Sequence, residues 1–150
     1  MGGEFVSQVP LVVGIDSNLA HEKHFLMMDY DDRLLLDALV IEIKRLQHKY
    51  SLGNAHIVET SDNHFSAFFF EECMDYFDAL RIIHDTGCCL SFKRARMIFD
   101  EMTIRLTPKK GKYKPRLVRI VEGHEKEINR QQRAIRQFVL KAIDCRGIKG

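Results

Sequence analysis

The chain has 150 residues, of which 45% are hydrophobic and 29% are charged, a balance that is typical of one globular domain and excludes a disordered segment. No apolar run approaches the roughly 20 residues that cross a bilayer, and the first residues lack the basic and apolar parts of a secretory signal. The four cysteines show no metal-binding or disulfide spacing. We therefore expect a single cytoplasmic (intracellular) domain over residues 1–150, with free thiols and no membrane partner.

The formal net charge is only +2, but the charge is unevenly distributed. Residues 1–92 hold 6 Lys/Arg and 15 Asp/Glu, whereas residues 93–150 hold 17 Lys/Arg and 6 Asp/Glu. A basic half of this kind indicates a surface that binds a polyanion. Two ordinary solvated surfaces are the alternative interpretation.

The first part of the chain alternates between strand and helix patterns. Four segments have the apolar or aromatic composition of strands: 11–15, 24–29, 55–60 and 64–70. From Asp32 the apolar residues recur at spacings of three and four, which predicts about 19 residues of helix with Asp32 as N-cap and Gly53 as the stop. Residues 61–63 predict a tight turn between the last two strands.

The second part of the chain adds two helices and further strands. A second amphipathic helix is expected to close at Gly87, with an apolar side formed by Met74, Phe77, Leu80 and Ile83, or Ile82. Strands are predicted at 96–99, 102–107 and 116–121, and the last two would flank a basic hairpin loop at 109–115. A helix over 125–144 follows, with Ile128, Ala134 or Ile135, Phe138, Val139 and Ile143 as its apolar stripe.

This order of elements, β-α-β-β-α-β with an added strand and a C-terminal helix, defines the expected fold class. It predicts an α+β domain of the split β-α-β, ferredoxin-like kind, in which an antiparallel sheet carries two helices on one face. The core would span about 24–121 and the C-terminal helix about 125–144. In this arrangement the strand that begins at His64 should lie beside the strand that ends at Asp29.

The acidic end of the second strand is the first candidate for chemistry. Asp29 and Asp31 are two residues apart on one strand, so their side chains share a face. Neighbouring carboxylates repel, and a bound Mg²⁺ or Mn²⁺ with oxygen ligands relieves that repulsion. The alternative is that Asp31 and Asp32 cap the following helix while Asp29 is solvated.

The turn before His64 is the second candidate. His64 opens an aromatic strand, and it could donate a hydrogen bond to a phosphate while Ser61, Asn63 and the amides of the turn help to hold that phosphate. A histidine that only stabilises the hairpin is the alternative.

Basic residues in the last third form the third candidate. The densest cluster comprises Arg105 and four lysines of the following loop: Lys109, Lys110, Lys112 and Lys114. The fork of Arg105 suits a phosphate, with Lys109 and Lys110 beside it, and Lys112 and Lys114 would act along a nucleic-acid backbone. A solvated, lysine-rich loop is the alternative.

The C-terminal helix adds a further basic face. Arg130 and Arg133, followed by Arg136, have spacings of three, which places them on one side of the helix. That side could follow a nucleic acid, or it could simply be solvated.

Three segments together resemble motifs of the archaeo-eukaryotic primase superfamily, including its small phage and plasmid primase-polymerases. They are residues 25–31 (FLMMDYD), 60–64 (TSDNH) and 103–109 (TIRLTPK). The resemblance implies an RRM-like catalytic core in which Asp29 and Asp31 bind Mg²⁺ or Mn²⁺ and His64 contacts the phosphates of a nucleoside triphosphate. It implies a nucleotidyltransferase for DNA replication, which synthesises primers or adds nucleotides on single-stranded DNA or RNA.

The chain departs from this family pattern in two places. The second motif has no glycine, and the third acidic residue of the family has no clear counterpart. Asp100, next to Glu101, is the best candidate for the third metal ligand, and Asp85 is a poorer one. A member that works with a replication-protein partner, or that is catalytically silent, would also fit.

Two other classes compete with the enzyme. A non-catalytic RRM-like module, which binds nucleic acid or a replication partner, needs exposed aromatic rings on its sheet. The candidates for these are Phe65, Phe68, Phe69 and Phe70. A replication-initiator endonuclease needs a second histidine where Ser66 stands and a nucleophilic tyrosine, for which Tyr113 is the only late candidate.

Overall fold

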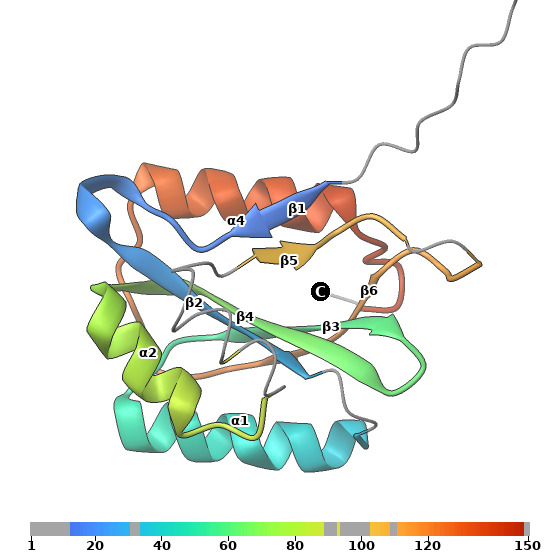
Figure 1. The fold of residues 1–150 in the computed structure, drawn as a ribbon, viewed down its shortest axis with the longest axis horizontal. Helices are drawn as coiled ribbons and strands as arrows, with labels where there is room; N and C mark the ends of the chain where they lie inside the picture. The colour runs from blue at the N-terminus through green and yellow to red at the C-terminus, as the bar shows by residue number, and fades with distance from the viewer. Residues whose placement is uncertain (1–12, 31–33, 89–92, 94–102, 109–110, 149–150) are drawn as a thin grey trace, which may run out of the picture.

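Apolar strands build a four-stranded antiparallel sheet in the order β2–β4–β3–β6 (Figure 1). The computed structural model describes residues 13–30, 34–88, 93, 103–108 and 111–148. The strands of this sheet are β2 (His24–Tyr30), β3 (Ala55–Ser61), β4 (His64–Met74) and β6 (Arg116–Val121). A second antiparallel pair consists of β1 (Gly14–Asp16) and β5 (Thr103–Arg105). The helices are α1 (Leu36–Tyr50), α2 (Tyr76–His84) and α4 (Arg130–Ala142), with a short 3₁₀ turn at Ala20–Glu22.

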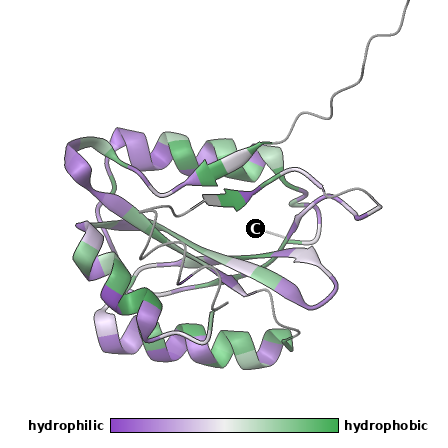
Figure 2. Cartoon of the chain, viewed as in Figure 1, coloured by the Kyte–Doolittle hydropathy of each residue, from purple (hydrophilic) through white to green (hydrophobic). Residues whose placement is uncertain are grey.

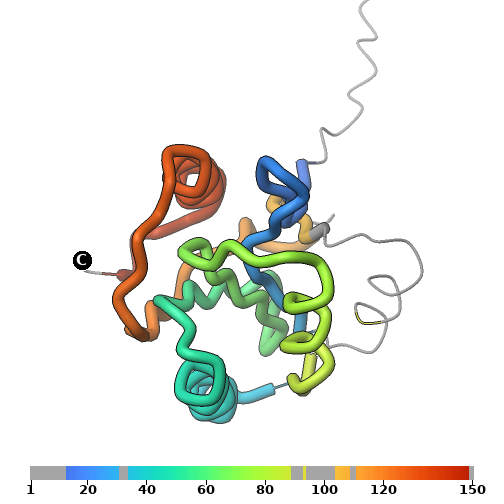
Figure 3. Tube along the Cα trace, turned by 90° about the vertical axis from the view of Figure 1, so that its left-hand side faces the viewer, coloured from blue at the N-terminus to red at the C-terminus, as the bar shows by residue number. Residues whose placement is uncertain are grey.

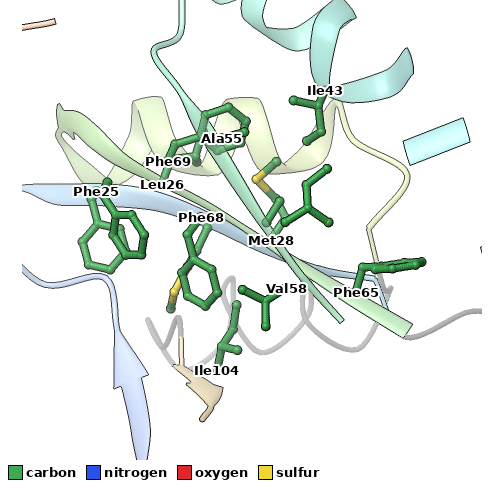
Figure 4. Close-up of a cluster of buried hydrophobic side chains, with 14 of the residues drawn as sticks. Phe25, Leu26, Met28, Ile43, Ala55, Val58, Phe65, Phe68, Phe69 and Ile104 are labelled. Carbon is green, nitrogen blue, oxygen red and sulfur yellow. The ribbon is translucent and has the colours of Figure 1, made fainter. Parts of the chain in front are cut away.

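The large sheet lies between two layers (Figures 1 and 3). Helices α1 and α2 cover one face, and α4 covers the other face together with the β1–β5 pair. Side chains alternate along β4, so Phe69 lies on the same side as Ile43 of α1, while Phe68 lies on the same side as Ile104 of β5 (Figure 4). All four of these side chains are buried, so the sheet is packed on both faces.

The expected α+β class is confirmed, and so is the expected pairing of the His64 strand with the Asp29 strand. Strand β4 pairs with β2 and with β3, so the His64 strand lies beside the Asp29 strand, and α1 and α2 share one face. The fourth strand differs from the ferredoxin-like order, because β6 pairs with β3 and no strand of the described ranges pairs with the outer edge of β2.

The predicted hairpin between residues 102–107 and 116–121 is wrong. Strand β5 pairs with β1, and β6 pairs with β3, so the two strands belong to different sheets. The chain turns away directly after β5, where the Arg105 guanidinium donates to the carbonyl oxygens of Thr107 and Pro108. The strand predicted at 96–99 lies outside the described residues.

The predicted ends of the first helix are also wrong. Helix α1 begins at Leu36, and Leu35 occupies the N-cap position without a side-chain hydrogen bond, so Asp32 is not the cap. The helix ends at Tyr50, and its C-cap residue Ser51 has a left-handed φ of 53°. Gly53 has another role: a Cβ at this position would lie 2.5 Å from the Glu71 Oε1 atom, so the close approach of that carboxylate requires glycine.

Helix α2 is shorter than its apolar pattern suggested. It starts after Asp75, whose side chain accepts a hydrogen bond from the Asp78 amide, so Met74 belongs to β4 and not to the helix. Ile83 is buried as expected, but Phe77 is 74% exposed, so its predicted place in the apolar stripe is wrong.

Helix α4 begins five residues later than predicted, because Asn129 and Gln132 form a capping box that fixes its start. Gln132 is buried and also donates to the carbonyl oxygens of Phe70 and Glu72 on β4, at 3.1 and 2.9 Å. This register buries Val139 as expected but leaves Phe138 50% exposed, against the prediction. Within the described ranges, no helix has the length and apolar character to cross a membrane.

Candidate functional site

A cavity of about 370 Å³ lies where the ends of β2, β3 and β4 meet β5 and the segment before β6. Its lining comprises Asp29, Thr60, Ser61, His64, Ser66, Ile104, Arg105, Thr107, Lys112 and Pro115. The lining thus combines two cations, an imidazole, four hydroxyl groups and a single carboxylate. Its residues are far apart in the sequence, and the strand pairing brings them together.

Asp29 enters this cavity from the end of β2. It lies opposite Ser66 in the register of β2 with β4, and the Ser66 hydroxyl donates to the Asp29 Oδ1 atom at 3.1 Å. Ser66 is fully buried, whereas Asp29 is partly exposed. The buried hydroxyl therefore fixes the orientation of a carboxylate that still reaches solvent.

The β3–β4 hairpin supplies the imidazole. Ser61 pairs with His64 across a two-residue turn, and the Thr60 hydroxyl donates to the His64 carbonyl oxygen at 3.3 Å. Because side chains alternate along a strand, His64 shares a face with Ser66 and therefore with Asp29. The predicted neighbourhood of Asp29 and His64 thus follows from the strand register.

Asn63 shapes the turn but does not line the cavity. Its φ of 58° is left-handed, which asparagine tolerates better than most residues. Its amide donates to the Glu59 carboxylate at 3.4 Å, and its carbonyl oxygen accepts from the Leu34 amide at 3.1 Å. The structure therefore places Asn63, which was predicted as a phosphate ligand, in the turn and outside the cavity lining.

Arg105 is held in position by its own loop. Its Nε and Nη2 atoms each donate at 3.0 Å, to the carbonyl oxygens of Thr107 and Pro108. A guanidinium has five N–H donors, so these two bonds leave three for an anion in the cavity. The carbonyl partners are neutral, and the positive charge of Arg105 is therefore not cancelled by them.

Lys112 is positioned by contacts of the residues that follow it. The Tyr113 hydroxyl donates to the Asp62 carboxylate at 3.2 Å, and Arg116 donates through Nε to Glu59 at 2.9 Å. The Arg116 guanidinium also lies 4.9 Å from the centre of the Tyr113 ring. Burial raises the pKa of Tyr113 to about 12, with further contributions from Glu59 and Asp62, so the hydroxyl stays protonated and keeps donating.

These contacts make the cavity suited to an anion. Arg105 and Lys112 line it without a carboxylate partner among the described residues, and Asp29 is its single acid. A phosphate accepts several hydrogen bonds from arginine, lysine, histidine and hydroxyl groups. The arrangement can therefore hold a phosphate beside a carboxylate.

Within the described lining, a divalent metal ion would meet a single carboxylate, that of Asp29. Within the described ranges, no group of three or more His, Cys, Asp and Glu side chains could hold a metal ion. Mg²⁺, however, is commonly bound by one or two carboxylates plus the phosphates of a substrate. Asp29 next to the cationic half of the cavity matches that mode.

Comparison of the chain with protein-family models, with curated proteins and with solved structures gave no match.

The remaining predicted residues lie elsewhere. Lys114 lines a second hollow, together with Arg116, Asp144 and Arg146. The two predicted arginines of α4 are exposed on that helix. Four predicted ligands lie outside the described residues: Asp31, Asp100, Lys109 and Lys110.

Sequence reasoning missed three hydroxyl groups of the cavity. Thr60 and Thr107 carry no signal beyond lying next to predicted residues. Ser66 does have a recognisable signal in the sequence. It is the only hydroxyl side chain in the aromatic run 64–70, and it lies two residues after His64.

Proposed function

We propose that the cavity binds the phosphates of a nucleoside triphosphate and that the protein is a metal-dependent nucleotidyltransferase of primase or primase-polymerase type. The observation that supports this proposal is the convergence of Asp29, His64 and Arg105, from three different strands, on one cavity. An isolated carboxylate or histidine would have suited helix capping or a hairpin equally well. Together with Lys112 they supply both the anion-binding and the acidic part that nucleotidyl transfer needs.

Each residue of the cavity would have its own role in binding the nucleotide. Arg105 and Lys112 would hold the phosphate chain, and His64 would donate a hydrogen bond to a phosphate oxygen. Ser66 would keep the Asp29 carboxylate oriented through the bond observed at 3.1 Å. A bound Mg²⁺ or Mn²⁺ would stabilise the negative charge that develops on the phosphates.

The reaction would join a nucleotide to a strand end on single-stranded DNA or RNA. A hydroxyl group of the strand end would lose its proton to solvent and its oxygen would bond to the α-phosphorus. The bond from that phosphorus to the oxygen of pyrophosphate would break, which releases pyrophosphate. Asp29 would be a ligand of that metal ion, and Asp31 remains its predicted companion. A replication-protein partner that supplies a missing acid also stays a prediction.

The finer fold assignment is part of the proposal. The β2–β4–β3 order with α1 and α2 on one face supports an RRM-like core. The pairing of β6 with β3, rather than a strand beside β2, is the feature in which such a core would be modified.

The non-catalytic RRM-like alternative has less support from the structure. Base stacking on a sheet needs exposed aromatic rings. The candidate rings of β4, including Phe70, are at most 2% exposed, and helices or the β1–β5 pair cover both faces of the sheet. The endonuclease alternative lacks its second histidine, and the hydroxyl of Tyr113 is bonded to Asp62 in a loop.

A nucleotide-incorporation assay tests the proposal. The wild-type protein should extend a primer, or start one, on single-stranded DNA with either ribo- or deoxyribonucleotides when Mg²⁺ or Mn²⁺ is present. Replacing both acids (Asp29→Asn with Asp31→Asn) should reduce incorporation by roughly 100-fold or more, because the charge that holds the metal is lost. Asp37→Asn, an exposed residue of α1, is the matched control and should leave activity unchanged. Undiminished incorporation by the double variant would rule out the acidic site.

A further inference from the structure

The outer face of α4 carries positive charge that the protein does not neutralise. The helix has four Lys/Arg and no Asp/Glu in its 13 residues, and Figure 2 shows hydrophilic residues recurring along it. Arg136 turns toward the sheet and lies 3.9 Å from the Glu71 carboxylate. Arg130, Arg133 and Lys141 are exposed, and no carboxylate of the described residues pairs with them.

An exposed aromatic ring lies on the same face. Phe138 is 50% exposed, although the next residue, Val139, is completely buried. The residue one turn earlier is Ala134, which is too small to cover a ring that points back toward the start of the helix. Rows of cations beside an open aromatic ring are the combination with which proteins bind single strands, since rings stack on bases and cations contact phosphates.

The face is long enough for several nucleotides. At about 1.5 Å per residue, Arg130 and Lys141 are roughly 16 Å apart along the helix axis. The cations are spaced along this length, with Phe138 near one end. A folded acidic protein could also meet such a face, but the open ring among cations favours a strand whose bases are unpaired.

Backbone hydrogen bonds connect the segment after α4 to the segment that lines the cavity. The Asp144 amide donates to the Pro115 carbonyl oxygen at 2.9 Å, and the Leu117 amide donates to the Asp144 carbonyl oxygen at 2.8 Å. Pro115 lines the cavity, and Lys114 lines the neighbouring hollow with Arg146. Helix α4 and β5 also share one layer of the fold (Figures 1 and 3).

We infer that the outer face of α4 binds the single-stranded nucleic acid on which the cavity acts. Phe138 stacks on a base, Arg130, Arg133 and Lys141 contact phosphates, and the strand passes Lys114 toward the cavity. The assignment of this strand as substrate rests on the proposed function, whereas binding of the strand by α4 does not.

Fluorescence anisotropy with a labelled oligothymidylate of about 20 nucleotides tests the inference. Phe138→Ala should weaken binding roughly 5- to 100-fold, because one stacked base is lost, and Phe138→Tyr should restore most of it. Phe77→Ala on α2 is the matched control, since that ring is even more exposed but lies on the opposite layer, and it should bind like the wild type.

Salt dependence provides a second readout. Between about 50 and 200 mM salt, Arg130→Gln with Arg133→Gln should reduce the slope of log affinity against log salt by about 1.4, which corresponds to two lost phosphate contacts. Lys44→Gln on α1, also exposed, should leave the slope unchanged.

Two results would overturn the inference. Equal oligonucleotide affinity for Phe138→Ala and Phe77→Ala would remove the stacking role. A Phe138→Ala protein with altered sedimentation but unchanged oligonucleotide affinity would assign the face to protein association. The α4 surface and the nucleotide cavity can also be tested separately. If Phe138→Ala loses oligonucleotide binding and the wild type binds no ATP with Mg²⁺, the α4 surface is supported and the nucleotide cavity is refuted.

Discussion

Replacing Arg105 by lysine tests the geometry of the cavity while keeping its charge. In the wild type, Arg105 lines the cavity, donates to the carbonyl oxygens of Thr107 and Pro108, and has three further N–H groups. A lysine has one compact ammonium group on a flexible stem, so it cannot hold two carbonyl oxygens and also present a pair of donors to a phosphate.

The expected loss follows from those bonds. A hydrogen bond to a charged group contributes about 1.5–3 kcal/mol, so Arg105→Lys should weaken the binding of ATP with Mg²⁺ roughly 10- to 100-fold. The free energy of unfolding should change by less than about 1 kcal/mol, because water can replace the donor at the Thr107 and Pro108 carbonyl oxygens. Isothermal titration calorimetry measures the first quantity and urea denaturation the second.

Arg119→Lys is the matched control, because Arg119 is exposed on β6 and lies outside the cavity lining. It should bind ATP like the wild type. Wild-type affinity in Arg105→Lys, or an equal loss in Arg119→Lys, would refute the assignment of the guanidinium to phosphate binding.

Three further predictions concern the framework around the site. Gln132→Ala should lower the free energy of unfolding by about 2–3 kcal/mol, because it removes the capping box of α4 and leaves two carbonyl oxygens of β4 without their donor. Gly123→Ala should destabilise by about 1–3 kcal/mol, because its Cβ would lie 2.4 Å from the rigid Gly53 carbonyl oxygen. Burial, with a smaller contribution from Arg136, lowers the pKa of His56 from 6.5 to about 4. Between these values the unfolded chain binds a proton that the folded protein does not, so stability should fall as the pH drops from about 6.5 to about 4, by up to about 3 kcal/mol.

Urea denaturation checks all three predictions against matched variants. Gln137→Ala lies on the exposed side of α4 and should change the free energy of unfolding by no more than about 0.5 kcal/mol. In Gly147→Ala the new Cβ would approach only one atom, at 3.8 Å, so it should be similarly mild. His56→Gln should flatten the pH dependence, whereas exposed His124→Gln should retain it. Equal effects within any of these pairs would contradict the reasoning for that pair.

The local parts of the fold were predictable from the sequence because they depend on neighbouring residues. The bounds of β6 and the β3–β4 hairpin follow from alternation and turn residues. The start of α1 at Leu36 was missed, because its N-cap position makes no side-chain bond that a capping motif would reveal. The start of α4 had such a motif in Asn129 and Gln132.

Long-range choices were less visible. Phe138 and Val139 are both apolar, and the choice between them depends on the register that the bonds of buried Gln132 to β4 impose. A rule that buries apolar residues and exposes glutamine would bury Phe138 and expose Gln132, whereas the structure shows the reverse. The separation of β5 from β6 likewise depends on pairing with β1, which lies at the other end of the sequence.

The same distinction between local and long-range features applies to the residues of the candidate site. Asp29, His64 and Arg105 were recognisable because charged or titratable residues interrupt apolar strands. Ser66 was not, because its contribution depends on lying opposite Asp29 in the strand register.

The central claim is that the cavity binds the phosphates of a nucleotide, and an NMR titration of the ¹⁵N-labelled protein with ATP and Mg²⁺ tests it most directly. Up to about 1 mM nucleotide, we expect saturable shifts of the Ser61, His64, Arg105 and Lys112 amides and of the His64 ring nitrogens. The amide of Arg119, outside the cavity, should not move. Shifts centred elsewhere, or none over this range, would contradict the account.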